Sequence, residues 1–383
     1  MHILIIPSWY INNFNPLSGI FFKEQAEALV KQNHKIGLLT IHRNRINLIL
    51  KEKKDFFFNK IYKEKGVYTH RVEYPSTRIY ILNKYIKLKI FQRIFLTYID
   101  KNGMPDIVHL HSFMDGELAM WVKKNYNIPY IVTEHFSGFA RGTISKSNLH
   151  YAKRVFENAS YNIAVSKEFQ GLLESKYSVK FHYLPNIVNV DFFQNTSMTN
   201  EQEKEFTFIN IASLNKNKNQ EMLIRSFNSA FNANENIKLI IAGDGPEYTN
   251  LKKCIKELNL TKQVTLYGSA SRKEVRTLLQ KSNAFVLSSN YETFGIVIIE
   301  AMACGLPVVA TKCGGPESIV TDNKLGVLCE INEKSMSKAL KTVYENKDIY
   351  NAQYIRNYTV DNFSETAIVE KLNVIYKKVL KVT

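Results

Sequence analysis

The sequence predicts an α/β fold made of two Rossmann-like domains, whose parallel sheets are expected to face each other across a cleft. Two observations lead to this prediction. Short apolar runs alternate with helical stretches along the chain, and the alternation starts again after a polar segment without periodicity at 189–206. The length of 383 residues also suits two domains of about 190 residues each.

Each half supplies the strands of one sheet. The first half predicts a helix at 18–32 and strands at 2–7, 35–41, 106–112, 129–135, 162–166 and 181–186. The second half predicts strands at 206–213, 238–245, 264–269, 284–289 and 307–312. We therefore expect an amino-terminal domain at 1–188 and a carboxyl-terminal domain at 189–363. The remaining stretch, 364–383, is expected to be a helix that packs back on the first domain.

The composition is typical of a cytoplasmic globular protein. Hydrophobic residues make up 45% of the chain and charged residues 22%. The opening MHILIIPSWY has too short an apolar run for a signal peptide, and no run of about 18 apolar residues predicts a membrane span. The cysteines show no CxxC spacing and are expected to be reduced thiols: Cys254, Cys304, Cys313 and Cys329.

Positive charge is concentrated in one segment. The formal net charge is +16, and residues 41–101 hold fifteen Lys/Arg against five acidic residues, among large apolar side chains at 56–58 and 85–99. Such a segment could face anionic lipid or an anionic acceptor. A buried helix with solvated edges fits the same facts, so both interpretations stay open. Nucleic acid is not expected as a partner, because no binding motif accompanies the charge.

Two glutamates mark the candidate site. The stretch ETFGIVIIE places Glu292 in a loop at the carboxyl end of a strand and Glu300 on the helix that follows. Ligands bind at that edge of an open α/β sheet, and backbone amides at a helix N-terminus favour a phosphate. Solvated carboxylates that only complement the helix dipole are the alternative. Gly314 and Gly315 form a turn whose bare backbone can approach a ligand closely.

Other polar residues also follow strands. His135 comes at a strand's carboxyl end and is expected to line the site, whereas His109 and His111 point to one side of a strand, for a structural role or a metal. The lysine loop 213–220 follows another strand. No pair of aspartates is separated by one residue, so cations and amides, not a divalent metal, are expected to neutralise a bound diphosphate. GDGPEY at 243–248 lacks the third glycine of a dinucleotide fingerprint, so no cofactor is expected.

Taken with these residues, the chain resembles retaining glycosyltransferases of family 4, the group 1 type with the GT-B fold. The resemblance covers essentially the whole length and is strongest from Val264 to Val320. It implies that Glu300 holds the ribose hydroxyls of a nucleotide-sugar, and that Glu292 with the amides at Phe294 and Gly295 holds the donor sugar. Gly19 lets the backbone approach the diphosphate, His135 contacts the donor sugar and Lys218 neutralises the leaving diphosphate. The resemblance also implies that 1–188 is the acceptor-side domain and 189–363 the nucleotide-sugar-binding domain. Further donor-site residues are Ser213, Lys216, Gly243, Gly268, Thr293 and Ile296.

The chain departs from the family pattern at two places. Ser213 stands near the position of an arginine that commonly precedes the lysine, and Ile187 replaces a glycine after the Pro-Asn turn. Either Lys216 compensates for the missing arginine charge, or the phosphate is held more weakly. Because both glutamates remain, we expect an active enzyme.

The resemblance implies metal-independent hexosyl transfer with retained anomeric configuration, from a UDP- or GDP-sugar to a hydroxyl of a glycan or lipid-linked acceptor. Cell-surface polysaccharide or glycolipid biosynthesis is the expected context. The location is expected to be cytoplasmic, with peripheral binding to the inner membrane face left open. A non-hydrolysing UDP-sugar epimerase and a sugar-nucleotide binding protein without turnover are the alternatives.

Overall fold

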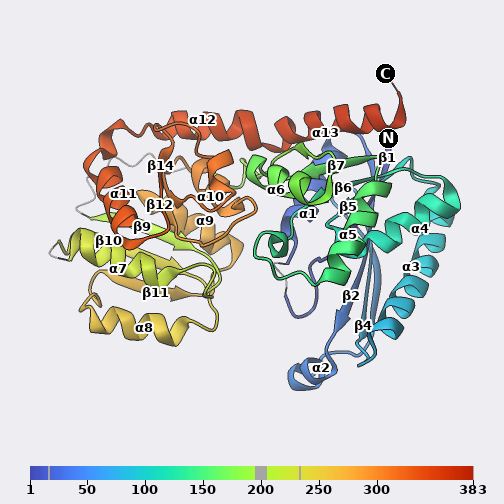
Figure 1. Cartoon of the computed structure of the whole chain (residues 1–383), viewed down its shortest axis with the longest axis horizontal. Coiled ribbons are helices and arrows are strands. Elements are labelled where there is room, and N and C mark those ends of the chain that lie inside the picture. Colours follow the sequence, from blue (N-terminus) through green and yellow to red (C-terminus); the bar gives the residue numbers. More distant parts are fainter. Residues whose placement is uncertain (16–17, 195–204, 233, 383) are drawn as a thin grey trace. The chain divides into compact units, whose positions relative to one another are not determined.

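The computed structural model describes residues 1–15, 18–194, 205–232 and 234–382 (Figure 1). Most of the predicted linker, residues 195–204, therefore lies outside the described residues. The chain divides into two compact units. The first comprises Met1–Val165, Gln170–Ile187 and Ile368–Thr383, and the second comprises Ser166–Phe169 and Val188–Ala367. Ser166–Phe169 joins the second unit, where the Lys167 amide donates to the Ser318 hydroxyl over 2.9 Å.

The first unit contains an eight-stranded sheet in the order β3-β4-β2-β1-β5-β6-β7-β8. Its strands are β1 (His2–Pro7), β2 (Lys35–Asn44), β3 (Phe58–Glu64), β4 (Val67–Pro75), β5 (Ile107–His111), β6 (Tyr130–Glu134), β7 (Tyr161–Ala164) and β8 (His182–Tyr183). All neighbouring strands are parallel except β3 and β4.

The β3–β4 hairpin adds an antiparallel edge to a sheet that is otherwise parallel, as expected. Lys65 and Gly66 form its two-residue turn, both with positive φ, as the favoured hairpin turns require. β3 is an edge strand in which most side chains are exposed. Sequence periodicity missed it because an exposed edge strand buries no apolar face that would mark it.

Helices cover both faces of this sheet. They are α1 (Ile20–Lys31), α2 (Ile46–Glu52), α3 (Tyr80–Asn102), α4 (Gly116–Tyr126), α5 (Lys146–Asn158), α6 (Lys167–Tyr177) and α13 (Glu365–Leu380). Phe22 of α1 and Leu372 of α13 belong to one buried cluster with Ile3 and Ile5 of β1. On the other face Tyr98 of α3 lies against Gly37, where any Cβ would collide with its ring.

The second unit contains a six-stranded parallel sheet in the order β11-β10-β9-β12-β13-β14. Its strands are β9 (Phe206–Ile211), β10 (Ile237–Ala242), β11 (Val264–Gly268), β12 (Ala284–Leu287), β13 (Val308–Thr311) and β14 (Gly326–Cys329). β14 was not predicted from the sequence, because four residues after a turn, two buried and two partly buried, give too short an apolar run.

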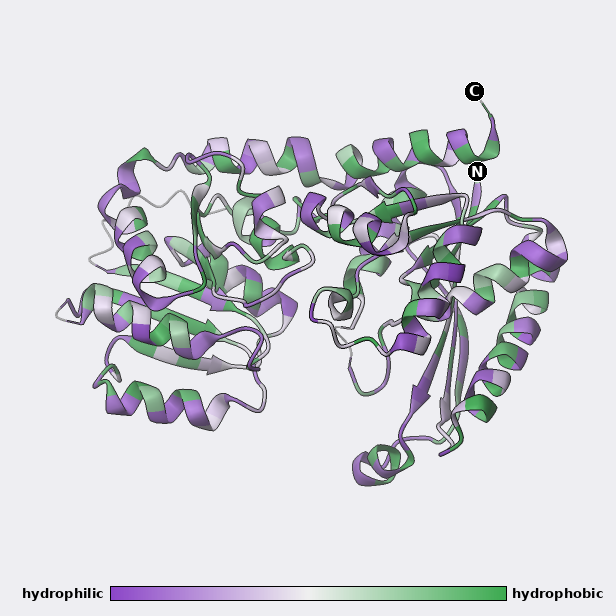
Figure 2. Cartoon of the chain, viewed as in Figure 1, coloured by the Kyte–Doolittle hydropathy of each residue, from purple (hydrophilic) through white to green (hydrophobic). Residues whose placement is uncertain are grey.

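The helices of this unit are α7 (Gln220–Phe231), α8 (Tyr248–Glu257), α9 (Arg272–Gln280), α10 (Ile296–Ala303), α11 (Glu333–Glu345) and α12 (Ala352–Phe363). Residues of α7, α8 and α11 share a buried cluster with the sheet. Figure 2 shows much of the second sheet in the green of hydrophobic residues. Each sheet is therefore a core layer whose carboxyl edge carries polar loops.

Within residues 1–15, 18–194, 205–232 and 234–382, no helix is long and apolar enough to cross a membrane. All four cysteines are free and buried, and within the same ranges no cluster of three or more candidate ligands could hold a metal ion.

Candidate active site

The carboxyl edge of the second sheet gathers most of the predicted site residues. The strand order reverses between β9 and β12, because β10 and β11 follow on one side and β13 and β14 on the other. The loops that leave β9 and β12 therefore meet at a topological switch point, where open α/β sheets bind ligands. Lys218 lies in the first of these loops and Glu292 in the second.

Hydrogen bonds hold the two loops together. The Asn290 amide donates to the Asn217 carbonyl over 2.7 Å, and the Asn217 side chain donates to the Tyr291 carbonyl over 3.0 Å. The Ser288 hydroxyl donates to the carbonyl of Lys218 over 2.7 Å. The backbone that carries Lys218 is thus fixed to the backbone that carries Glu292.

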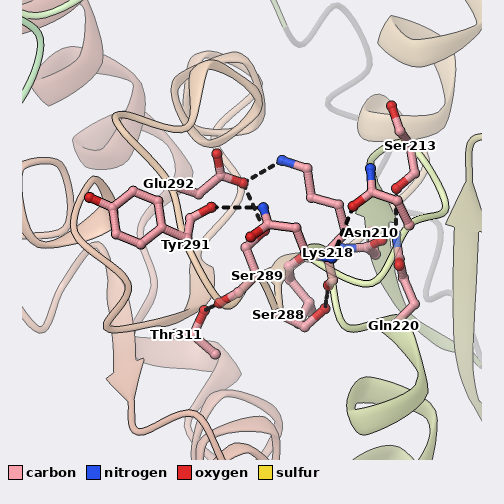
Figure 3. A network of polar contacts seen from close by, with 12 residues as sticks. Asn210, Ser213, Lys218, Gln220, Ser288, Ser289, Tyr291, Glu292 and Thr311 are labelled. Atoms are coloured by element: carbon pink, nitrogen blue, oxygen red, sulfur yellow. Dashed lines mark hydrogen bonds and ion pairs between the residues drawn. The ribbon is translucent and has the colours of Figure 1, made fainter. Parts of the chain in front are cut away.

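Lys218 and Glu292 point toward each other in this frame (Figure 3). Lys218 Nζ lies 2.5 Å from Glu292 Oε1, and the Ser289 hydroxyl donates to the same oxygen over 2.7 Å. The two charged side chains are 24% and 13% exposed. The arrangement places a cation and a carboxylate side by side, both still reachable from solvent.

The lysine loop carries a second cation close in sequence. Lys216 is exposed, and its side chain makes no hydrogen bond or ion pair with the residues that the structure describes. Ser213 is also exposed, and its carbonyl accepts a hydrogen bond from the Gln220 side chain over 3.2 Å. Lys216, not Ser213, therefore supplies additional positive charge in this loop.

Gly243 and Gly268 support the neighbouring loops through their backbones. Gly243 has φ +148°, and a Cβ there would lie 1.9 Å from the Ala212 carbonyl oxygen. Its amide donates to the Gly268 carbonyl over 2.8 Å. Gly268 has φ +87° with open space where a Cβ would be. Close packing explains the glycine at 243, whereas only backbone conformation requires the one at 268.

The N-terminus of α10 follows Glu292 directly. Gly295 precedes the helix with φ +99°, and Thr293 and Phe294 lead into it while Ile296 is its first residue. The Phe294 side chain is buried against Phe363, so its backbone alone is available at the site. Within the described parts of the chain, the amides of Phe294 and Gly295 donate to no acceptor. They are free to meet an anionic ligand.

Two glycines of the turn after β13 pack against the backbone that carries these amides. A Cβ on Gly315 would lie 2.3 Å from the Phe294 carbonyl oxygen, and one on Gly314 would lie 3.0 Å from the Glu292 carbonyl oxygen. The turn after β13 therefore packs directly against the backbone of the Glu292 loop.

Glu300 has a partner that the sequence interpretation missed. Arg272, the first residue of α9, donates to Glu300 Oε1 over 2.9 Å. Its guanidinium also lies over the Phe193 ring, 4.8 Å from the centroid. Burial raises the pKa of Glu300, and the arginine opposes that shift. The only sequence signal was a basic residue directly after a helix N-cap serine, a pattern without specificity.

His135 lies in the first unit, in an apolar surrounding. The rings of Phe21 and Phe22 lie 5.3 and 5.2 Å from its ring. Burial lowers the pKa of His135 to about 3, so the imidazole is neutral at physiological pH. A neutral imidazole can position a ligand by hydrogen bonding but is not a cationic acid.

Glu134 fixes the backbone around His135. Its Oε1 accepts from the Ser112 hydroxyl and from the amides of His135 and Phe136, over 2.7, 2.9 and 2.8 Å. Its Oε2 accepts from the Phe113 amide over 2.8 Å. Burial raises the pKa of Glu134 to about 7 despite these four donors. The sequence interpretation did not select Glu134, although it directly precedes His135 at the strand end.

Two further predicted residues of the first unit are Gly19 and His109. Gly19 precedes α1 with φ +67°, and a Cβ there would lie 2.9 Å from both the Trp9 carbonyl oxygen and the Phe22 ring. His109 lies between Tyr376 and Thr133, with 2.7 Å from each ring nitrogen to a hydroxyl. His109 thus serves the packing of α13 on the sheet.

Comparison with known proteins identifies the family. Residues 191–360 match the family described as glycosyl transferases group 1, and residues 18–192 match Glycosyltransferase Family 4. The chain belongs to glycosyltransferase family 4. A probable sucrose-phosphate synthase from Thermosipho melanesiensis is 26% identical over 93% of this chain and 91% of that protein. The alpha-monoglucosyldiacylglycerol synthase of Acholeplasma laidlawii is 26% identical over 70% and 73%, respectively.

Solved structures confirm the GT-B fold of this family 4 glycosyltransferase. The sucrose-phosphate synthase from Thermosynechococcus elongatus superposes with a TM-score of 0.80 at 19% identity, with complete coverage of both chains. Anabaena Alr3699/HepE in complex with UDP superposes with a TM-score of 0.76 at 17% identity, over 99% of this chain and 100% of that one. The family and fold expected from the sequence are both confirmed.

Proposed function

We propose that this glycosyltransferase moves a hexosyl group from a nucleotide-diphosphate-sugar to an acceptor hydroxyl with retained configuration and without a metal ion. The observation that supports it most is the Lys218–Glu292 pair beside the free amides of Phe294 and Gly295. A diphosphate has the charge to attract Lys218 away from Glu292. The carboxylate released in that exchange can then accept hydrogen bonds from sugar hydroxyls.

The developing charge decides which residues act in the reaction. As the bond to the anomeric carbon breaks, negative charge grows on the leaving phosphate, where Lys218 and the α10 amides stabilise it. The departing phosphate accepts the proton of the acceptor hydroxyl, which attacks from the same face. Glu300 holds the ribose hydroxyls, with Arg272 orienting its carboxylate. As the family resemblance implies, Gly19 lets the backbone approach the diphosphate and the neutral His135 contacts the donor sugar.

Related proteins support the donor class. Anabaena HepE was solved with UDP-glucose, at a TM-score of 0.73 and 16% identity. The direct test is release of nucleotide diphosphate from UDP-, GDP- and ADP-sugars, with and without an acceptor extract, followed by NMR of the product's anomeric proton. Release that depends on the acceptor, with retained configuration, is expected. Epimerised donor without release would establish the epimerase alternative, and binding without either would establish a non-catalytic protein.

We further propose that the enzyme binds peripherally to anionic membranes through α2 and the first turns of α3. Phe57, Ile79 and Ile81 are 72%, 61% and 78% exposed in the same segment that carries the excess of Lys and Arg. Figure 2 shows hydrophobic and hydrophilic residues side by side along α3. Apolar side chains that insert and cations that meet lipid phosphates are the two components of interfacial binding.

Vesicle flotation tests this proposal. The wild type is expected to float with phosphatidylglycerol-rich vesicles at low salt, less so at 0.5 M NaCl because of screening, and not with phosphatidylcholine vesicles. The variant Ile79→Ser/Ile81→Ser should float less, with Val374→Ser, an exposed apolar residue of α13, as the matched control. Equal flotation with anionic and neutral vesicles would contradict the proposal.

A further inference from the structure

The first unit holds a cavity that the donor residues do not line. It has a volume of about 440 Å³, within the usual range for small-molecule sites. Ser8 follows β1 and Phe113 follows β5, and both line it. The strand order of this sheet reverses between β1 and β5, so the cavity lies at the switch point of the first sheet.

The charges that line this cavity do not cancel. Arg43, Lys84 and Lys87 provide three cations, and Asp115 provides one carboxylate. Lys87 Nζ lies 2.5 Å from Asp115 Oδ1, so this partly buried pair is internally neutralised. His42 also lines the cavity, and burial lowers its pKa, so it adds no charge at neutral pH. Arg43 and Lys84 are left as the excess positive charge.

Neither of these two cations is strongly engaged. The Arg43 side chain is exposed and makes no ion pair or hydrogen bond with any residue that the structure describes. Lys84 lies 4.7 Å from the Tyr151 ring centroid and 5.6 Å from that of Tyr80. Its one carboxylate contact, with Glu117, is 4.0 Å long between half-exposed side chains. Such a pair contributes little and leaves the ammonium available.

The rim of the cavity continues into the apolar start of α3. Tyr80 lines the cavity and is 58% exposed, and its neighbours Ile79 and Ile81 project into solvent. An anionic group in the cavity would therefore have an apolar surface directly beside it. A phosphate joined to a hydrocarbon chain matches both features.

We propose that this cavity is the acceptor site and that it recognises an anionic group, phosphate above all, on the acceptor molecule. Arg43 and Lys84 bind that group. The aromatic rings of Tyr80 and Tyr151 hold the Lys84 ammonium in place. This assignment rests on the proposed glycosyl transfer, since it names the substrate class of the same reaction. It makes Arg43 and Lys84 specificity-determining residues for the acceptor.

Calorimetric titration of the full-length protein tests the assignment. The probes are n-octyl phosphate, its neutral counterpart n-octyl β-glucoside, and glycerol 3-phosphate. Octyl phosphate is expected to bind at least tenfold more tightly than octyl glucoside. The variant Arg43→Gln/Lys84→Gln should weaken octyl phosphate at least tenfold, because it removes both cations that no close carboxylate among the described residues neutralises; the one ion pair lost there with them is the 4.0 Å contact of Lys84 with Glu117. Lys89→Gln, an exposed lysine of the same helix that does not line the cavity, is the control and should change affinity less than twofold.

The calorimetric results distinguish failure of the acceptor-site assignment from failure of the proposed glycosyl transfer. Unchanged octyl phosphate affinity in the double variant, no binding to the wild type, or equal binding of octyl glucoside would each overturn the assignment. Comparable affinities for glycerol 3-phosphate and octyl phosphate support a soluble anionic acceptor, whereas a strong preference for octyl phosphate supports a lipid-linked one. Titration of the same samples with UDP and GDP reports the donor site separately. Failure of the wild type to bind either would count against the proposed function, not against the anion site.

Discussion

Replacing Lys218 by alanine tests the proposed mechanism at its main electrostatic contact. The mutation removes the cation that lies 2.5 Å from Glu292, but the Ser289 hydroxyl still donates to that carboxylate. Since both side chains are partly exposed, water can replace the ammonium, and we expect the free energy of unfolding to fall by only about 1 kcal/mol. Any large loss of activity would therefore not come from unfolding.

The expected kinetic effect is much larger. The charge that meets Lys218 grows as the leaving phosphate departs, so the mutation should lower kcat by about 10²-fold, or about 2.7 kcal/mol. Donor affinity should fall less than kcat, because the ground-state diphosphate keeps the α10 amides and the exposed Lys216. The assay is nucleotide diphosphate release, with kcat and KM determined separately and the donor Kd measured by calorimetry.

Two further variants make the result interpretable. Lys218→Arg keeps the charge and should recover part of kcat. Lys216→Ala removes an exposed lysine of the same loop without breaking an ion pair and should reduce kcat less than tenfold. Intact turnover in Lys218→Ala combined with lost turnover in Lys216→Ala would refute the reasoning and reassign the leaving-group contact.

Three other outcomes are expected. Glu300→Ala should raise the donor KM more than it lowers kcat, because ribose contacts are similar before and during the reaction; a selective loss of kcat would contradict this. Transfer should persist in excess EDTA, and complete loss restored by Mn²⁺ would refute metal independence. Burial lowers the pKa of His109 to about 3, so its neutral form stabilises the fold fully above pH 6.5 and progressively less as the pH falls. In urea titrations from pH 6.5 to 5, His109→Asn should therefore flatten the decline in the free energy of unfolding by up to about 1.4 kcal/mol per pH unit, and an unchanged slope would count against this.

Some structural features could be read from local sequence alone. Buried strands and amphipathic helices have their own periodicities, so most of the alternation that defines both sheets was predictable. The position of Glu292 after β12 and of Lys218 after β9 followed from the same reading, because a loop at a strand end is a local feature. β3 escaped this logic, since an exposed edge strand has no buried face to mark it; β4 was also missed, although most of its residues are buried.

Which residues meet was decided only by the tertiary structure. Lys218 and Glu292 are 74 residues apart, and they touch because β9 and β12 are neighbours at the point where strand order reverses. Arg272 of α9 reaches Glu300 of α10, and Arg43 of β2 shares one cavity with Asp115, which directly precedes α4, because long-range packing brings these elements together. Strand order depends on long-range packing of whole faces, which leaves no trace in local periodicity. The sequence by itself determined most of the elements and most of the candidate side chains, whereas sheet topology determined their partners.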